Sequence, residues 1–310
     1  MRFEIVTIFP EFFSSIFENG ILRRALAEGL VTVEVHDLRA FTHDRHRTVD
    51  DRPFGGGEGM VLKPEPLAEA LASLGIRSKA ERQEDSQAAE SIPSEGGGGF
   101  NPRIVPTNST RALAPEGKPS SNPAPRTRVI LLSAQGRPFT QALARELART
   151  ERVVLICGRY EGVDERINQL YCDMELSIGN YVLSGGELAA AVVVDATTRL
   201  VPGVLGNEAS GEFESFGVAD AEIAAAEDGV PRSQHGSGGL LDYPHYTRPA
   251  EFGGLRVPDT LLNGDHTEIR RWRREQQLRK TLANRPDLLE GAALSKEDRK
   301  LLETIREKTE

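Results

Sequence analysis

The chain has little cysteine and no long apolar run. Its two cysteines, Cys157 and Cys172, lie in or beside apolar stretches. They are too few for a disulfide framework, which predicts buried, reduced thiols of the kind found in cytoplasmic proteins. The apolar stretch at residues 2–9 has the length of a strand, does not resemble a signal peptide, and no other run approaches the length of a membrane-spanning helix. We therefore expect a cytoplasmic protein without a membrane span.

The chain also has fewer basic than acidic residues, 38 Lys and Arg against 47 Asp and Glu. The net charge of −9 argues against a protein that coats nucleic acid over its whole surface, but it leaves room for a local basic patch. Hydrophobic residues make up only 38% of the chain, so we expect part of it to lie outside the core. That part is residues 77–127, which are rich in Pro, Gly and Ser and contain a GGGG run. Their apolar surface is too small to offset the entropy of ordering, which predicts a disordered or loosely held insertion.

The remaining sequence alternates between strand and helix patterns. Apolar, β-branched runs predict strands at residues 2–9, 31–38, 128–133, 152–158 and 172–178. Helical spacing of apolar residues predicts helices at 12–28, 64–75, 141–150 (with Thr140 as its cap), 186–198, 266–284 and 294–308 (with Ser295 as its cap). Uniformly apolar strands in repeated βα units predict an α/β fold, a mostly parallel sheet with helices on both faces.

Three polar, glycine-containing loops follow the predicted strands. They are SAQGRPF from Ser133, GRYEGVDER after Cys157 and GNYVLSGGE after Ile178. Ligands of parallel sheets bind at the carboxyl ends of the strands, so we expect these loops to form one pocket. The third loop has no lysine and matches neither common phosphate-binding glycine pattern. Its main-chain groups and apolar residues suit an adenine, while the alternative is a helix start in which Ser184 and Glu187 form a capping box.

Two basic segments have competing interpretations. The loop at 43–60 contains three arginines and four glycines, which suit phosphates and the close approach of a base or ribose; its two histidines lack the further ligands that zinc requires. Residues 269–280 place six cations around Trp272. A charged helix face is usually only solvated, but this density in an acidic chain favours binding of a polyanion such as RNA.

Several long motifs occur in the order found in one known family. The sequence resembles the bacterial tRNA (guanine-N1)-methyltransferases of the SPOUT class over nearly all of its length except about 77–127 and 217–239, which look like insertions. The motifs are FPEFF, DDRPFGGGEGMV, ICGRYEGVDERI, SIGNYVLSGGELAA, TRLVPGVLGNEAS, LDYPHYTRP and HTEIRRWRREQQLRKT. The resemblance implies methylation of guanine N1 at tRNA position 37, next to the anticodon, with S-adenosyl-L-methionine as the methyl donor.

The resemblance also implies the architecture and the donor site. It implies a deep trefoil knot in the methyltransferase domain and an obligate homodimer with active sites between subunits. The implied donor-binding residues are Ala134, Gly158, Glu161, Ile178, Gly179, Asn180, Tyr181, Val182, Leu183, Gly185 and Gly186. Family members commonly have proline in place of Ala134 and aspartate in place of Asn180.

Catalysis at guanine N1 requires a general base for the N1 proton and a cation or donor facing O6. The resemblance assigns the cation to Arg199 and the base to Glu214, where relatives commonly have aspartate; Asp242 is the rival base. Magnesium dependence is implied too, but the sequence shows no dedicated set of oxygen ligands.

The motifs divide the chain into three expected parts. Residues 1–206 form the SPOUT methyltransferase domain, 207–240 an interdomain linker with an insertion, and 241–310 a helical domain that binds tRNA.

Overall fold

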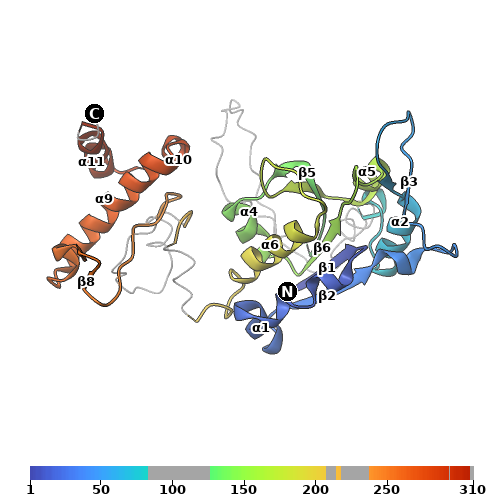
Figure 1. Cartoon of the computed structure of the whole chain (residues 1–310), viewed down its shortest axis with the longest axis horizontal. Helices are drawn as coiled ribbons and strands as arrows, with labels where there is room; N and C mark the ends of the chain where they lie inside the picture. Colours follow the sequence, from blue (N-terminus) through green and yellow to red (C-terminus); the bar gives the residue numbers. More distant parts are fainter. Residues whose placement is uncertain (83–125, 207–213, 218–236, 293, 308–310) are drawn as a thin grey trace, which may run out of the picture. The chain divides into compact units, whose positions relative to one another are not determined.

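The structure, a computed structural model of the chain (Figure 1), describes residues 1–82, 126–206, 214–217, 237–292 and 294–307. Most of the two expected insertions, at 77–127 and 217–239, lies outside these residues. Close contacts divide the chain into two compact units, which are described separately. Unit 1 comprises Met1–Glu18, Val31–Phe139 and Arg149–Val194. Unit 2 comprises Asn19–Leu30, Thr140–Ala148 and Asp195–Glu310.

Unit 1 is built on a five-stranded sheet in the order β2-β1-β6-β5-β7. The strands are β1 (Arg2–Thr7), β2 (Thr32–Asp37), β5 (Thr127–Pro138), β6 (Arg152–Cys157) and β7 (Met174–Ser177). Every pairing in this sheet is parallel, which confirms the predicted α/β class. Consecutive residues of β1 and β6 are buried, so both faces of the central strands are covered.

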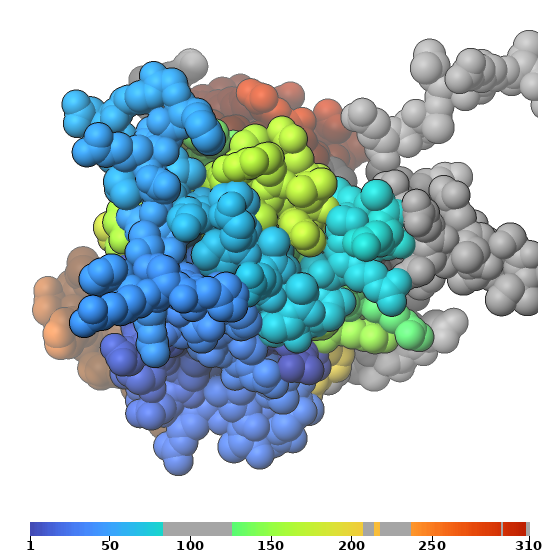
Figure 2. Space-filling model, turned by 90° about the vertical axis from the view of Figure 1, so that its right-hand side faces the viewer, coloured from blue at the N-terminus to red at the C-terminus, as the bar shows by residue number. Residues whose placement is uncertain are grey.

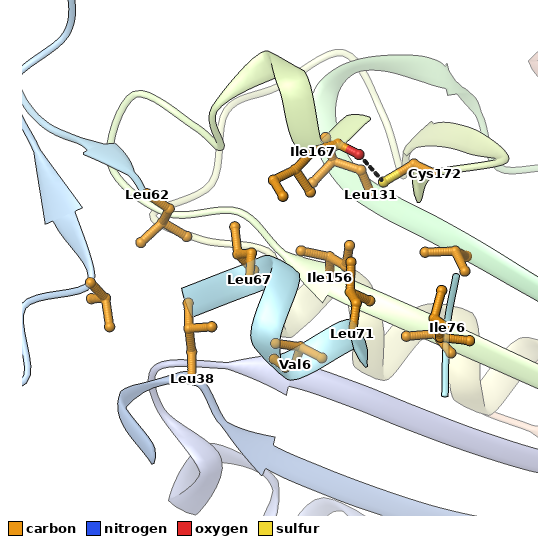
Figure 3. Close-up of a cluster of buried hydrophobic side chains, with 14 of the residues drawn as sticks. Val6, Leu38, Leu62, Leu67, Leu71, Ile76, Leu131, Ile156, Ile167 and Cys172 are labelled. Carbon is orange, nitrogen blue, oxygen red and sulfur yellow. Dashed lines mark hydrogen bonds between the residues drawn. The ribbon is translucent and has the colours of Figure 1, made fainter. Parts of the chain in front are cut away.

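One face of the sheet carries the apolar cluster drawn in Figure 3. Helices α2 (Pro64–Ser73) and α5 (Glu165–Tyr171) contribute to it, with Leu67 and Ile167 packing near Val6 and Ile156 of the strands. Cys172 is buried at the edge of this cluster, and its thiol donates to the Ile167 carbonyl at 3.7 Å. Burial raises the pKa of Cys172 to about 12. Cys157 is buried too, so the expectation of buried thiols is confirmed.

A charged group interrupts the apolar pattern of the central strand. Glu4 is fully buried in β1, and Arg152 of the neighbouring strand β6 donates to its carboxylate at 2.8 Å. Arg2 approaches the same carboxylate at 2.8 Å. A buried carboxylate persists only when it is paired, so these two arginines explain how a glutamate is accommodated in the middle of the sheet.

Most predicted elements are present, with one clear correction. The helix predicted at 12–28 is broken into two single-turn helices, η1 (Pro10–Phe13) and η2 (Ile16–Glu18), and a short helix α1 (Gly20–Ala27). Gly20 adopts a positive φ of 61°, which interrupts the helix even though the apolar spacing continues. The sequence prediction also missed α5, where Asp164 caps the first turn by accepting from the Arg166 amide at 3.0 Å.

The other predicted helices lie close to their expected limits. They are α4 (Gln141–Ala148), α6 (Glu187–Thr198), α9 (His266–Asn284) and α11 (Lys296–Glu307). Thr140 and Ser295 accept from the amides of Leu143 and Asp298 at 3.3 and 3.0 Å, so both predicted caps are confirmed. A short helix α10 (Asp287–Gly291) and the two-residue strands β3 (Asp50–Asp51), β4 (Val61–Leu62), β8 (Glu251–Phe252) and β9 (Leu255–Arg256) were not predicted. None of the described helices is long and apolar enough to cross a membrane.

The C-terminal helices of unit 2 have a core of their own. Leu240, Leu278 and Ile305 form a buried apolar cluster. Arg274 of α9 and Asp298 of α11 add an ion pair at 2.8 Å. The described part of the expected linker is tied to this core, because the amide of Phe216 donates to the Leu240 carbonyl at 2.8 Å.

Strand β5 extends beyond its predicted end and touches β7 twice. Leu132 and Arg137 both align with Leu176, because residues between them bulge out of the ladder. The backbone at Gly136 passes very close to β7: a Cβ atom there would lie 2.3 Å from the Leu176 nitrogen and 2.5 Å from the Glu175 carbonyl carbon. Only glycine leaves room for this close approach of two main chains.

We predict that Gly136→Ala lowers the free energy of unfolding by about 3 kcal/mol, the upper end of the usual effect of overpacking. The physical reason is that a methyl group must displace backbone rather than a flexible side chain. Urea denaturation checks this result. Gly291→Ala is the matched control, since a Cβ at Gly291 meets no atom within 4 Å. Equal stability of the two variants would contradict the close approach.

Candidate active site

The three glycine-containing segments of unit 1 converge on one cavity of about 420 Å³ at the carboxyl ends of β6 and β7; the first segment, predicted as a loop, is the bulge within β5. Each loop supplies wall residues, including Ala134, Glu161 and Tyr181. The prediction that these loops form one pocket is therefore confirmed. Ten of the eleven residues expected to bind the donor line the cavity; Asn180 is exposed and is not part of the wall.

The glycine turn before α6 is held against the end of β6 by main-chain contact. The Gly186 amide donates to the Gly158 carbonyl at 2.9 Å. A Cβ atom at Gly186 would lie 2.7 Å from the Cα of Cys157. The wall of the cavity is therefore largely backbone at this point.

The alternative interpretation of the turn, a capping box of Ser184 and Glu187, is wrong. The Glu187 carboxylate instead accepts from the Thr7 hydroxyl at 2.8 Å and from the Arg159 guanidinium at 3.1 Å. Arg159 also donates to the Ser184 carbonyl at 3.0 Å and lies 4.5 Å from the ring centre of Phe9. Because Glu187 is only 2% exposed, this buried network fixes the first residue of α6 to the ends of β1 and β6.

The glycine-rich loop at 43–60 reaches the rim of the same cavity. The Glu161 amide donates to the Met60 carbonyl at 3.0 Å, and Gly59 lies against the Glu161 side chain. Figure 2 shows this face, with the light-blue loop beside the yellow-green residues that follow β6. His43 contacts Glu69 at 2.8 Å.

Unit 2 contains the two residues assigned to catalysis, in direct contact. Arg199 directly follows the last residue of α6, and its guanidinium donates to both carboxylate oxygens of Glu214 at 2.6 Å. The hydrogen bonds to Glu214 raise the pKa of Arg199 above its ordinary value, so the guanidinium stays charged. Gln141 of α4 donates to the same carboxylate at 3.2 Å. The site thus holds a hydrogen-bond acceptor, the Glu214 carboxylate, beside a donor, the Arg199 guanidinium.

The rival base, Asp242, lies beside this pair in the same unit. Its amide donates to the Ser215 hydroxyl at 2.9 Å, and Ser215 is the neighbour of Glu214 in the chain. The Asp242 carboxylate contacts His245 at 2.9 Å and accepts from the Tyr243 amide at 2.8 Å. The structure therefore brings both candidate bases into one constellation, with Arg199 bound to only one of them.

The basic helix α9 divides into two sets of cations. Arg274 and Arg279 are engaged inside the protein, with Asp298 and Glu275 at 2.8 and 2.6 Å. Arg271, Arg273 and Lys280 have no carboxylate partner in the described part of the chain. The expected polyanion surface is consequently smaller than the count of cations indicated.

Sequence reasoning missed the supporting residues of both sites. Gln141 and Arg159 were assigned to an ordinary helix and to a general loop, although each donates to an important carboxylate. One feature of the sequence pointed to Arg159: it directly follows a buried strand and a glycine, where ligand-binding residues of parallel sheets lie. Gln141 had none, because its partner Glu214 is remote in sequence.

One group of potential metal ligands occurs among the described residues: Glu4, Glu34 and His36. Both carboxylates already face guanidinium groups, from Arg2 and Arg152. Mg²⁺ prefers an octahedral set of oxygens and water, so this group does not match the expected magnesium requirement.

We predict that Arg159→Ala lowers the free energy of unfolding by about 3–5 kcal/mol, as expected when one partner of a buried ion pair is removed. The reason is that the buried Glu187 carboxylate would lose its guanidinium partner. Arg166→Ala is the matched control: its pair with Asp164 is exposed on the arginine side, and such pairs contribute about 0–1 kcal/mol. Thermal and urea unfolding measure both. Similar small losses in the two variants would show that Glu187 does not depend on Arg159.

Comparison with known proteins gives the family. A model of the family described as tRNA (Guanine-1)-methyltransferase TrmD matches residues 1–84 and 82–291. A tRNA (guanine-N(1)-)-methyltransferase of Koribacter versatilis is 49% identical over 306 residues, covering 99% of this chain and 98% of the relative. Proteins of the same description from Dehalococcoides mccartyi and Geobacter metallireducens are 44% and 42% identical, each over at least 97% of both chains. The chain belongs to the tRNA (guanine-N1)-methyltransferase family and is an enzyme of that class.

Proposed function

We propose that this enzyme transfers the methyl group of S-adenosyl-L-methionine to N1 of the guanosine at tRNA position 37. The observation that carries the proposal is the backbone-walled cavity at the carboxyl ends of β6 and β7. A flat base can approach main-chain amides and carbonyls there because Gly158, Gly185 and Gly186 carry no side chains. When bound, the donor would supply an electrophilic methyl group.

The charge of the cavity suits a cationic donor. Its wall includes the carboxylates of Glu161, Glu165 and Glu175 and only one guanidinium, Arg159. Arg159 is already paired with Glu187, so the remaining charge is negative. A sulfonium with an ammonium group is favoured by such a wall, even though Asn180 replaces the aspartate common in relatives.

The Arg199–Glu214 pair matches the edge of guanine. Guanine presents an N1–H donor beside the O6 acceptor, and the pair presents a carboxylate acceptor beside a guanidinium donor. As guanine enters, its O6 replaces Glu214 as the acceptor of hydrogen bonds from the Arg199 guanidinium. Glu214 then accepts the N1 proton, and the charge left on N1 and O6 faces the positive Arg199. Gln141 keeps Glu214 oriented during this exchange.

The remaining assignments also stay proposals. We assign the domains as 1–206, 207–240 and 241–310, with tRNA bound by the last. We also propose the trefoil knot, with which the close approach of Gly136 to the backbone of β7 is compatible. We further propose a homodimer in which the cavity of one subunit and the Arg199–Glu214 pair of the other act together. No magnesium site is assigned.

The proposal is tested by methyl transfer from labelled S-adenosyl-L-methionine to unmodified tRNA transcripts. We expect transfer to a transcript with guanosine at position 37, and at least a hundredfold less to one with adenosine there. The reason is that adenine offers no N1 proton to Glu214. Equal labelling of the two transcripts would move the methylated nucleotide elsewhere.

The two candidate bases are separated by isosteric changes. Glu214→Gln is expected to reduce turnover by about 10²–10⁴-fold, the usual contribution of a positioned base, because the amide does not accept the N1 proton. Donor affinity, measured by calorimetry, should remain within a factor of two. Asp242→Asn is the matched control and should retain most turnover. The opposite ranking of the two variants would assign the base to Asp242.

A further inference from the structure

A second cavity, in unit 2, is lined by aromatic and basic residues that the catalytic scheme does not use. It has a volume of about 480 Å³ and lies between the segment that follows Asp242 and helix α9. Its wall contains the rings of Tyr243, His245, Tyr246 and Trp272 together with Arg248 and Arg273. Leu261, Leu262 and Ile269 supply apolar surface.

The rings of this cavity are arranged in two ways. Tyr243 is buried, His245 lies 4.7 Å from its ring centre, and the Arg273 guanidinium lies 4.9 Å from the same centre. Tyr246 and Trp272 are tilted by 56° at 6.3 Å, so neither ring face is covered by the other. Tyr246 is 50% exposed. The exposed ring of Tyr246 therefore offers a stacking surface that no other ring of the described residues covers.

The charges of the cavity are not balanced. Arg248 and Arg273 have no ion-pair partner among the residues that the structure describes, and the Nε of Arg273 is buried there without an acceptor. The nearby Arg274, by contrast, is paired with Asp298. Positive charge beside an open ring face is the combination that binds an unstacked nucleobase with its phosphate.

The cavity is close to the catalytic pair within unit 2. Tyr243 follows Asp242, whose amide donates to Ser215, the neighbour of Glu214. A guanine held at Arg199 and Glu214 must leave its stack, and its neighbours in the loop lose stacking partners as a result. A site for one of those neighbours would offset part of that loss.

We propose that this cavity binds one unstacked nucleobase of the tRNA other than the methylated guanine. The base stacks on Tyr246 or Trp272, and its phosphate meets Arg248 or Arg273. This inference rests on the proposed function for the identity of the RNA, but its binding step is measured without catalysis.

The single tryptophan makes the cavity directly observable. Trp272 is the only tryptophan of the chain, so all tryptophan fluorescence reports on this wall. We expect an RNA anticodon stem-loop to quench that fluorescence in the absence of donor. Abasic substitution of the loop nucleotides, one at a time, should abolish quenching at one position that is not the methylated guanosine, while the loop still binds. Quenching that survives every abasic substitution, or no quenching with bound RNA, overturns the proposal.

A variant pair supplies the second arm. Tyr246→Ala should weaken binding of the stem-loop roughly 5- to 100-fold, the range expected for loss of one base–aromatic stack. Phe252→Ala, which removes an aromatic residue that is 80% exposed and outside the cavity, should change binding less than twofold. Equal effects of the two variants overturn the proposal. Methyl transfer is measured in parallel: quenching without transfer contradicts the proposed reaction alone, and transfer without quenching contradicts the base site alone.

Discussion

The close approach of main chains at the carboxyl end of the sheet is the constraint on which the candidate site depends. Gly136 lies against the backbone of β7, and Gly186 lies against Cys157 at the end of β6. Neither position has room for a side chain, so the loops are fixed by backbone rather than by interchangeable side-chain packing. A cavity walled in this way has a defined shape before any ligand enters, which reduces the entropy lost on binding.

The hydrogen bonds and the ion pair of Glu187 also fix the wall of the cavity. The Glu187 carboxylate joins the end of β1 through Thr7 and the loop after β6 through Arg159. Helix α6 therefore starts at a fixed point of the cavity wall. Arg199 directly follows the other end of this helix, where it meets Glu214.

Local chemistry explains which features were predictable from sequence. Apolar runs such as Val153–Ile156 and caps such as Ser295 depend on neighbours in the chain, and they were predicted correctly. The break at Gly20 was missed because apolar spacing continues across it. The role of Glu187 was misassigned because its partners, Thr7 and Arg159, are remote in sequence, whereas a capping box is local. Spacing also located the pocket loops but gave no means of finding Gln141 beside Glu214.

The distribution of charge in unit 2 resolves the apparent conflict between an acidic chain and an RNA substrate. The net charge of −9 describes the whole chain, whereas affinity for RNA depends on cations without internal partners. Arg274 pairs with Asp298 of the neighbouring helix α11, and Arg279 pairs with Glu275 one turn earlier in α9 itself. Among the described residues, the cations without an ion-pair partner include Arg248 and Arg273; both line the second cavity, and Arg273 lies over the Tyr243 ring. Cations placed beside aromatic rings suit contacts to individual nucleotides, and the proposed selection of one guanosine needs such contacts more than a uniformly basic surface.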